Sequence, residues 1–312
     1  MSPVIIEAIC LYWPILTALI LGFIFQISRR ECLGLLYALL WNLATLPILN
    51  GIAERYNWWS FSTTSPSLGG LPLSLWFGWA ALWGGATCIL TKKWPIWLIV
   101  GIAVGIDLLT MPLLQPLLIL NKGWLLGETL LLLGALIPGL MLYRWTSFQT
   151  RLALRTTLIA TGFALLTLVE IALAAHNGDW KNLELVLASR HPALLVALAP
   201  LAFAMCIPPI LAVREFVIVG KGTPVPMDAP QRLVTTGIYS RIRNPMQFGT
   251  IALLFLEALL LWNPWIALSA LSILIYSIGF ARWSEDEDMQ KRFGEDWLDY
   301  RRKVPAWRFR KK

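Results

Sequence analysis

The chain has 312 residues, of which 57% are hydrophobic and only 14% are charged. Ordinary soluble domains hold roughly 45–50% apolar and about 25% charged residues, so this composition excludes a soluble enzyme, a disordered chain and a disulfide scaffold. The mean hydropathy is +0.66. The net charge of +8 does not indicate nucleic acid, because basic excess in such an apolar chain is typical of cytoplasmic loops. We therefore expect an integral membrane protein that crosses the bilayer several times.

Nine apolar stretches approach the length of about 20 residues that a transmembrane helix needs. In chain order they are 4–27, 32–53, 71–91, 95–120, 123–143, 152–176, 191–213, 248–262 and 264–282. Pro112 and Pro116 interrupt the fourth stretch, and the eighth is short. Such segments are tolerated where neighbouring protein satisfies the freed backbone groups. The predicted fold class is an all-α polytopic membrane protein with about nine transmembrane helices.

The distribution of basic residues predicts the orientation of these spans. If the N-terminus lies outside and the spans alternate, 22 of the 26 Lys and Arg residues fall on one side and 4 on the other. The positive-inside rule makes the richer side cytoplasmic. We therefore expect an external N-terminus and a cytoplasmic C-terminus.

The chain divides into two unequal parts. Residues 1–190 are a predicted membrane bundle whose role the sequence does not indicate, and residues 191–312 form a second module. This module contains a loop at 214–247, a helical hairpin at 248–282 turning at Asn263-Pro264, and a charged tail at 283–312. Because a hairpin separates loop and tail, both emerge on the same face. The arrangement predicts a site at the boundary between membrane and cytosol.

Two blocks in the second module carry a motif. Residues 233–249 read L-V-T-T-G-I-Y-S-R-I-R-N-P-M-Q-F-G, and residues 284–305 read S-E-D-E-D-M-Q-K-R-F-G-E-D-W-L-D-Y-R-R-K-V-P. With the hairpin between them, these blocks resemble the isoprenylcysteine carboxyl methyltransferases and the related membrane phospholipid N-methyltransferases. The positions in register with that family are Leu233, Val234, Gly237, Tyr239, Arg243, Pro245, Gly249, Glu285, Phe293, Gly294, Tyr300, Val304 and Pro305.

The resemblance implies a membrane methyltransferase that uses S-adenosyl-L-methionine and acts on a lipophilic acceptor, with membrane lipids as its surroundings. In that family the cofactor lies between this loop and this tail. The implied cofactor contacts are Gln231, Leu233, Val234, Tyr239, Asn244, Pro245, Met246, Gln247 and Glu285. A carboxylate such as Glu285 suits the cofactor's ammonium group through a charge-assisted bond. Methyl transfer itself needs alignment and exclusion of water more than acid–base groups.

The chain departs from the family pattern at several positions. Asn244 stands where many members have His, and Gln247 stands where Tyr is usual. The arginine that binds the substrate carboxylate in prenylcysteine enzymes falls on Ala281, one residue before Arg282. Arg243 and Arg282 are therefore the candidates for orienting an acceptor.

The predicted spans contain four acidic residues, Asp107, Glu128, Glu170 and Glu257. Ionisable residues within a membrane are candidates for function. Glu257, in the eighth span, is a candidate for lining the entrance of a lipid substrate and for a structural ion pair. The four cysteines and two histidines show no metal-ligand spacing, so we predict no metal site. The G-x-x-x-G spacings Gly101/Gly105 and Gly123/Gly127 indicate close helix packing.

Other interpretations remain open at this point. The acidic run 285–288 is also typical of a helix N-terminus, and Arg241 and Arg243 are also typical of membrane-surface anchors. The chain could be a non-catalytic carrier or scaffold that keeps the fold, a phospholipid N-methyltransferase, or an enzyme with a second activity in residues 1–190.

Overall fold

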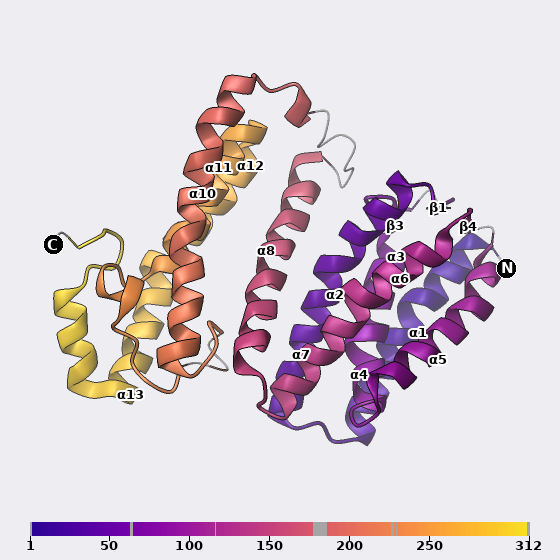
Figure 1. The fold of residues 1–312 in the computed structure, drawn as a ribbon, viewed down its shortest axis with the longest axis horizontal. Coiled ribbons are helices and arrows are strands. Elements are labelled where there is room, and N and C mark those ends of the chain that lie inside the picture. The colour runs from indigo at the N-terminus through magenta and orange to yellow at the C-terminus, as the bar shows by residue number, and fades with distance from the viewer. Residues whose placement is uncertain are drawn as a thin grey trace. The chain divides into compact units, whose positions relative to one another are not determined.

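The computed structural model describes residues 2–62, 65–115, 117–176, 186–225, 228 and 230–310, with the side chains of 171, 172, 174–176, 280–282 and 284 outside the description. The chain forms two compact units, Met1–Trp180 and Lys181–Lys312. Both are built almost entirely of helices (Figure 1). The role predicted for each part of the chain stays a prediction.

The first unit packs its helices around a central one. Its helical elements are α1 (Pro3–Ile24), α2 (Arg29–Arg55), α3 (Leu73–Ala81), η1 (Leu82–Ala86), α4 (Thr87–Leu90), α5 (Ile96–Thr110), η2 (Met111–Leu114), α6 (Trp124–Leu131), η3 (Leu132–Leu136), α7 (Ile137–Ser147) and α8 (Leu152–His176). Helix α2 contacts α3, α6, α7 and α8, which makes it the centre of the unit. Ser28 starts α2 with a capping box, because its hydroxyl accepts from the Glu31 N–H while the Glu31 carboxylate accepts from the Ser28 N–H.

Two short antiparallel ladders join the loops of this unit. Strand β1 (Trp59–Phe61) pairs with β4 (Leu118–Leu120), and β2 (Ser67–Leu68) pairs with β3 (Leu71–Pro72). The prediction of an interrupted span over 95–120 was therefore wrong at its end: α5 stops at Thr110, a 3₁₀ turn follows, and Leu118–Leu120 form β4. Pro112 is the second residue of that turn, since proline suits the first turn but not the interior of a helix.

The glycine spacings predicted to mark close helix packing do not meet a neighbouring helix in the structure: one packs on a side chain of strand β1 and the other faces open space. Gly127 lies under the Trp59 ring, where an added Cβ would come within 2.3 Å of it. Gly101 and Gly105 have no neighbouring atom within 4 Å, so the close packing expected there is absent from the part of the chain that the structure describes.

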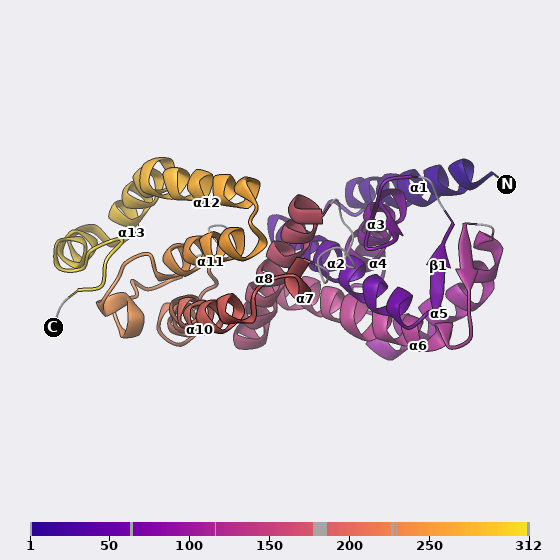
Figure 2. The same cartoon turned by 90° about the horizontal axis from the view of Figure 1, so that it is seen from above.

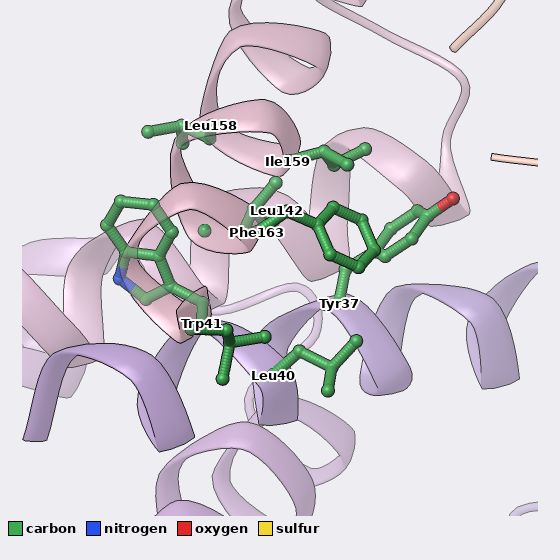
Figure 3. A pocket seen from close by; sticks show the side chains of 9 residues that line it. Tyr37, Leu40, Trp41, Leu142, Leu158, Ile159 and Phe163 are labelled. Atoms are coloured by element: carbon green, nitrogen blue, oxygen red, sulfur yellow. The ribbon is translucent and has the colours of Figure 1, made fainter. Parts of the chain in front are cut away.

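A small apolar hollow lies between α2, α7 and α8 of the first unit. Figure 3 shows Tyr37 and Trp41 of α2 on one side of it and Leu158, Ile159 and Phe163 of α8 on the other. The Tyr37 hydroxyl is the one polar side-chain end of its lining besides the Trp41 indole, whose N–H donates to the Gly134 carbonyl. The hollow therefore suits hydrocarbon and offers no group for chemistry.

The second unit is a three-helix layer followed by a bent tail helix. Its elements are α10 (Pro192–Glu215), η4 (Phe216–Gly220), η6 (Gly237–Ser240), α11 (Pro245–Leu261), α12 (Pro264–Tyr276), η7 (Ser277–Ala281) and α13 (Arg282–Lys303). Helix α11 packs against α10 on one side and α12 on the other (Figure 2). Trp262, with φ of 58°, ends α11, and the Asn263 side chain accepts from the Trp265 N–H to start α12.

Seven helices of the described chain are long and apolar enough to cross a membrane, and Pro245–Leu261 and Pro264–Gly279 are shorter apolar helices. The prediction of an all-α polytopic membrane protein is confirmed in its class. The number of nine spans stays a prediction, because the two hairpin helices are short.

Candidate functional site

The loop that carries the first motif is anchored on the end of the helix before it. Helix α10 continues through the π-turn η4 to Gly220, six residues beyond the start predicted for the loop. The Gly220 carbonyl accepts from the N–H groups of Gln231 (2.7 Å) and Arg232 (3.3 Å). Gly220 also lies against Pro230 and Val234, where a Cβ would come within 2.9 Å of each. The predicted residues Gln231, Leu233 and Val234 are thus held beside the end of a candidate span.

A buried acid fixes the next part of the loop. Glu215, at the end of α10, is 7% exposed and accepts a hydrogen bond of 2.6 Å from the Thr236 hydroxyl. Gly237 has φ of +56°, and a Cβ there would lie 2.5 Å from the Glu215 carboxyl carbon. Glycine is needed at this position both for its backbone angle and for the close approach.

Tyr239 connects the loop to the tail helix. Its ring stacks on Phe216 with centroids 5.2 Å apart, and its carbonyl accepts a 2.8 Å bond from the Tyr300 hydroxyl. Burial raises the pKa of both phenols, so both stay protonated at physiological pH. The apolar cluster around them brings loop and tail together; its buried members are Ala212, Val234, Tyr239, Trp297, Tyr300 and Val304.

The last residues of the described tail run along the R-x-R-N segment. The Pro305 carbonyl accepts from the Arg243 N–H at 3.0 Å, and the Ala306 carbonyl accepts from the Asn244 N–H at 3.3 Å. The Arg310 N–H donates in return to the Arg241 carbonyl at 2.8 Å. These bonds fix Asn244 and the start of α11, where Pro245 is the first helical residue and Met246 packs against the cluster.

Gln247 and Glu285 meet between α11 and α13. The Gln247 side-chain N–H₂ lies 3.4 Å from a Glu285 carboxyl oxygen, which is a long hydrogen bond. Glu285 as a residue is exposed, yet its carboxyl is partly desolvated by its neighbours. This desolvation and the adjacent Asp286 charge raise the pKa of Glu285, while Gln247 and Arg243 oppose the shift. Glu285 is therefore a carboxylate that an incoming cation would stabilise.

Two buried polar atoms, one on α11 and one on α13, have no hydrogen-bond partner among the described residues. They are the Gln247 side-chain oxygen and the indole N–H of Trp297, a residue that is only 8% exposed. Buried polar groups are normally satisfied, so such atoms indicate a bound group or water. The oxygen needs a donor, and the indole needs an acceptor.

Arg243 belongs to a network of charged side chains that joins the loop to α13. Its guanidinium lies 3.8 Å from one Asp286 oxygen, while Arg301 lies 3.2 Å from the other. The same guanidinium lies over the Trp297 ring, 5.8 Å from its centroid. Asp286 therefore holds two arginines, one from the loop and one from the tail.

The apolar cluster joins four of the nine predicted cofactor residues, Leu233, Val234, Tyr239 and Met246, and a hydrogen bond joins Gln247 to Glu285. The binding role of all nine residues stays a prediction. The structure places Glu257 away from Gln247 and Glu285, because Glu257 lies ten residues after Gln247 on α11, about 15 Å along a helix. The side chain of Arg282 lies outside the described residues, so its predicted role is untested. Sequence reasoning missed Glu215, Phe216 and Arg301, although a single acid closing an apolar span was a usable signal for Glu215.

The fold and the site define a polytopic membrane protein whose C-terminal unit packs a loop against a bent tail helix. The sequence model of the phospholipid methyltransferase family matches residues 216–296, from the π-turn η4 to the middle of α13. This confirms the resemblance of the C-terminal region to membrane methyltransferases. No curated protein and no solved structure matches the chain.

Proposed function

We propose that this protein is an integral membrane methyltransferase that uses S-adenosyl-L-methionine and methylates a lipophilic acceptor. The observation that supports this most directly is the overlap of the family match with the contacts between loop and tail. The cofactor supplies an electrophilic methyl group on a sulfonium. The residues proposed to bind it are Gln231, Leu233, Val234, Tyr239, Asn244, Pro245, Met246, Gln247 and Glu285.

The unsatisfied atoms of the site fit the amino-acid end of that cofactor. Glu285 and the Gln247 oxygen offer acceptors for an ammonium group, and the Trp297 indole offers a donor for a carboxylate. Tyr239 and Phe216 supply a stacked aromatic wall. The hydrogen bonds between loop and tail hold these groups in fixed positions, and a displacement reaction requires such alignment from the protein.

The acceptor reaches the site from the bilayer in this proposal, because α11 and α12 are apolar helices that flank it. A phospholipid amine is the acceptor that the family match favours over an isoprenoid carboxylate. Arg243, Arg282 and Glu257 are the residues we propose for orienting or admitting the acceptor. Loop and tail are proposed to lie on the cytoplasmic side, as the count of basic residues predicts.

The proposal is tested with membranes that contain the wild type, Glu285→Ala or Glu287→Ala. Glu287 is the matched control, because it lies on the same helix and pairs with Lys291 at the exposed surface. Each membrane receives S-adenosyl-L-methionine labelled on its methyl group and is then extracted with organic solvent. We expect label in the lipid extract from wild type and Glu287→Ala, and about 10- to 100-fold less from Glu285→Ala, as loss of a charge-assisted bond predicts.

Two outcomes would contradict the proposal. Equal label with Glu285→Ala and wild type would remove Glu285 from the cofactor site. No label with wild type, together with no binding of the donor to purified protein, would favour a non-catalytic carrier or scaffold.

A further inference from the structure

A basic surface forms where the last described residues of the tail cross the R-x-R-N segment. The Arg310 N–H donates to the Arg241 carbonyl at 2.8 Å, which places the backbones of two arginines from distant parts of the sequence side by side. Arg308 lies two residues before Arg310, and all three arginines are exposed, as is Phe309 between them. We call Arg241, Arg308, Phe309 and Arg310 the strap surface.

The three arginines of the strap surface carry unpaired positive charge. Lys291 and Arg302, which are also exposed on the tail, each pair with an acid on their own helix. Among the described residues, no acid lies within ion-pair distance of Arg241, Arg308 or Arg310. Like charges that have no counter-charge repel one another, so an anionic partner would stabilise this surface.

An aromatic contact places the strap surface at the boundary of the membrane. Phe309 is 44% exposed, and its ring meets the Phe248 ring edge-on with centroids 5.6 Å apart. Phe248 lies in the first turn of α11, an apolar helix of the predicted hairpin that begins at Pro245. The strap surface is therefore level with the end of a membrane-embedded helix. Aromatic side chains among basic ones are typical of segments that lie in the lipid interface.

We propose that the strap surface binds the phosphate groups of anionic phospholipids in the leaflet next to it. Guanidinium groups bind phosphate through two parallel hydrogen bonds, and basic residues within a Debye length of about 10 Å are attracted to an anionic membrane. A soluble polyanion offers nothing apolar to the exposed Phe309 ring, whereas a lipid offers its acyl chains. The inference does not rest on methyl transfer.

The proposal is tested by photo-crosslinking of the full-length protein in membranes. Phe309 is replaced by the photoreactive amino acid p-benzoylphenylalanine, which keeps an aromatic side chain in the middle of the strap surface. The protein is irradiated in vesicles of equal parts phosphatidylglycerol and phosphatidylcholine, without methyl donor, and mass spectrometry identifies the attached lipid. We expect at least about tenfold more adduct with phosphatidylglycerol, since each basic residue near an anionic membrane contributes a factor of about five.

Two pairs of substitutions in the photoreactive protein show whether the arginines cause this preference. Arg308→Gln with Arg310→Gln removes two unpaired charges and should lower the ratio of the two adducts at least about fivefold. Lys291→Gln with Arg302→Gln changes the net charge equally but removes cations that acids already neutralise, so the ratio should stay the same. Raising sodium chloride from about 0.05 M to about 0.5 M should lower the ratio, because salt screens exposed charges.

Three results would overturn the proposal. Equal adducts with the two lipids would show that the strap surface does not select negative charge. A lack of lipid adducts would show that it does not face the membrane. An equal fall of the ratio with both pairs of substitutions would assign the preference to net charge and not to the strap surface. The first two results need no substitution of an arginine, so they decide the question even if a variant does not fold.

Discussion

Glu285 combines two properties that rarely occur together on a surface helix. It is accessible as a residue, yet neighbouring groups desolvate its carboxyl and Asp286 lies next to it. A carboxylate that is desolvated and lies beside another negative charge is stabilised more by a cation than a fully hydrated carboxylate is. In the proposed function, the ammonium of the methyl donor is that cation.

The raised pKa of Glu285 predicts how donor binding depends on pH. The ionised form binds the ammonium, so binding is complete above the pKa of Glu285 and is lost as the pH falls through it. Because that pKa is raised, the loss should begin at a higher pH than for an ordinary glutamate near pH 4.3. We expect the Kd of the wild type to rise as the pH is lowered below neutrality, measured by titration calorimetry on the purified protein.

Two variants control this pH profile. Glu285→Gln should bind weakly and without dependence on pH in that range, since no carboxylate remains to titrate. Glu287→Gln should keep the wild-type profile, because Glu287 is exposed and pairs with Lys291. A pH-dependent Glu285→Gln protein would assign the titration to another group.

At the level of single residues, the sequence indicated the positions that carry the motif better than those that support it. Tyr239, Gln247 and Glu285 were predicted because the motif quotes them. Glu215 and Phe216 were not, because their roles depend on Gly237 and Tyr239, which fold back onto them from more than twenty residues away. Contacts of this kind have no local pattern in a sequence.

Among the elements, α13 has the geometry that matters most for the site. Gly294 has φ of 54° and ψ of −128°, so the helix is broken there into two segments (Figure 1). The first segment carries Glu285 and Asp286 to the start of α11. The second carries Trp297 and Tyr300 into the cluster around Tyr239. A straight helix could not place both pairs against the same loop.

The break at Gly294 yields a prediction for Gly294→Ala. An added Cβ would meet no atom within 4 Å, so a loss of stability must come from the backbone angles. Residues other than glycine rarely adopt these angles. We expect a loss of about 1–3 kcal/mol in stability and weaker donor binding. Thermal unfolding in detergent and a binding titration measure the two effects.

Gly105→Ala is the matched control for this substitution. Gly105 also has open space around it, but it lies inside the ordinary helix α5. Alanine there should be neutral or slightly stabilising, since alanine favours a helix over glycine by about 1 kcal/mol. Equal effects of both substitutions would show that the bend in α13 is not needed.

The elements also show where hydropathy stops being informative. The apolar stretch 95–120 predicted one interrupted span, but its last residues form strand β4 beside β1. A short apolar run such as Leu118–Leu120 is compatible with a helix and with a strand. Only the partner segment Trp59–Phe61, nearly sixty residues earlier, decides between them.

At the scale of the whole molecule, the charge asymmetry is the strongest signal. The basic residues gather at alternate ends of successive spans, which the positive-inside rule converts into an orientation. The polytopic class followed from composition alone, because no soluble fold of this size covers so much apolar surface. The number of spans did not follow, since α11 and α12 have only 17 and 13 residues.

The predicted orientation can be tested at two exposed lysines that it places on opposite sides of the membrane. Lys122 precedes α6 on the side poor in basic residues, and Lys303 ends α13 on the rich side. With the four native cysteines replaced, Lys122→Cys should react with a membrane-impermeant maleimide in intact cells. Lys303→Cys should react only after the membrane is permeabilised. The reverse pattern would place the candidate methyltransferase site outside the cytoplasm and would require an external source of the methyl donor. Reaction of both cysteines in intact cells would mean that the number of spans between them is even.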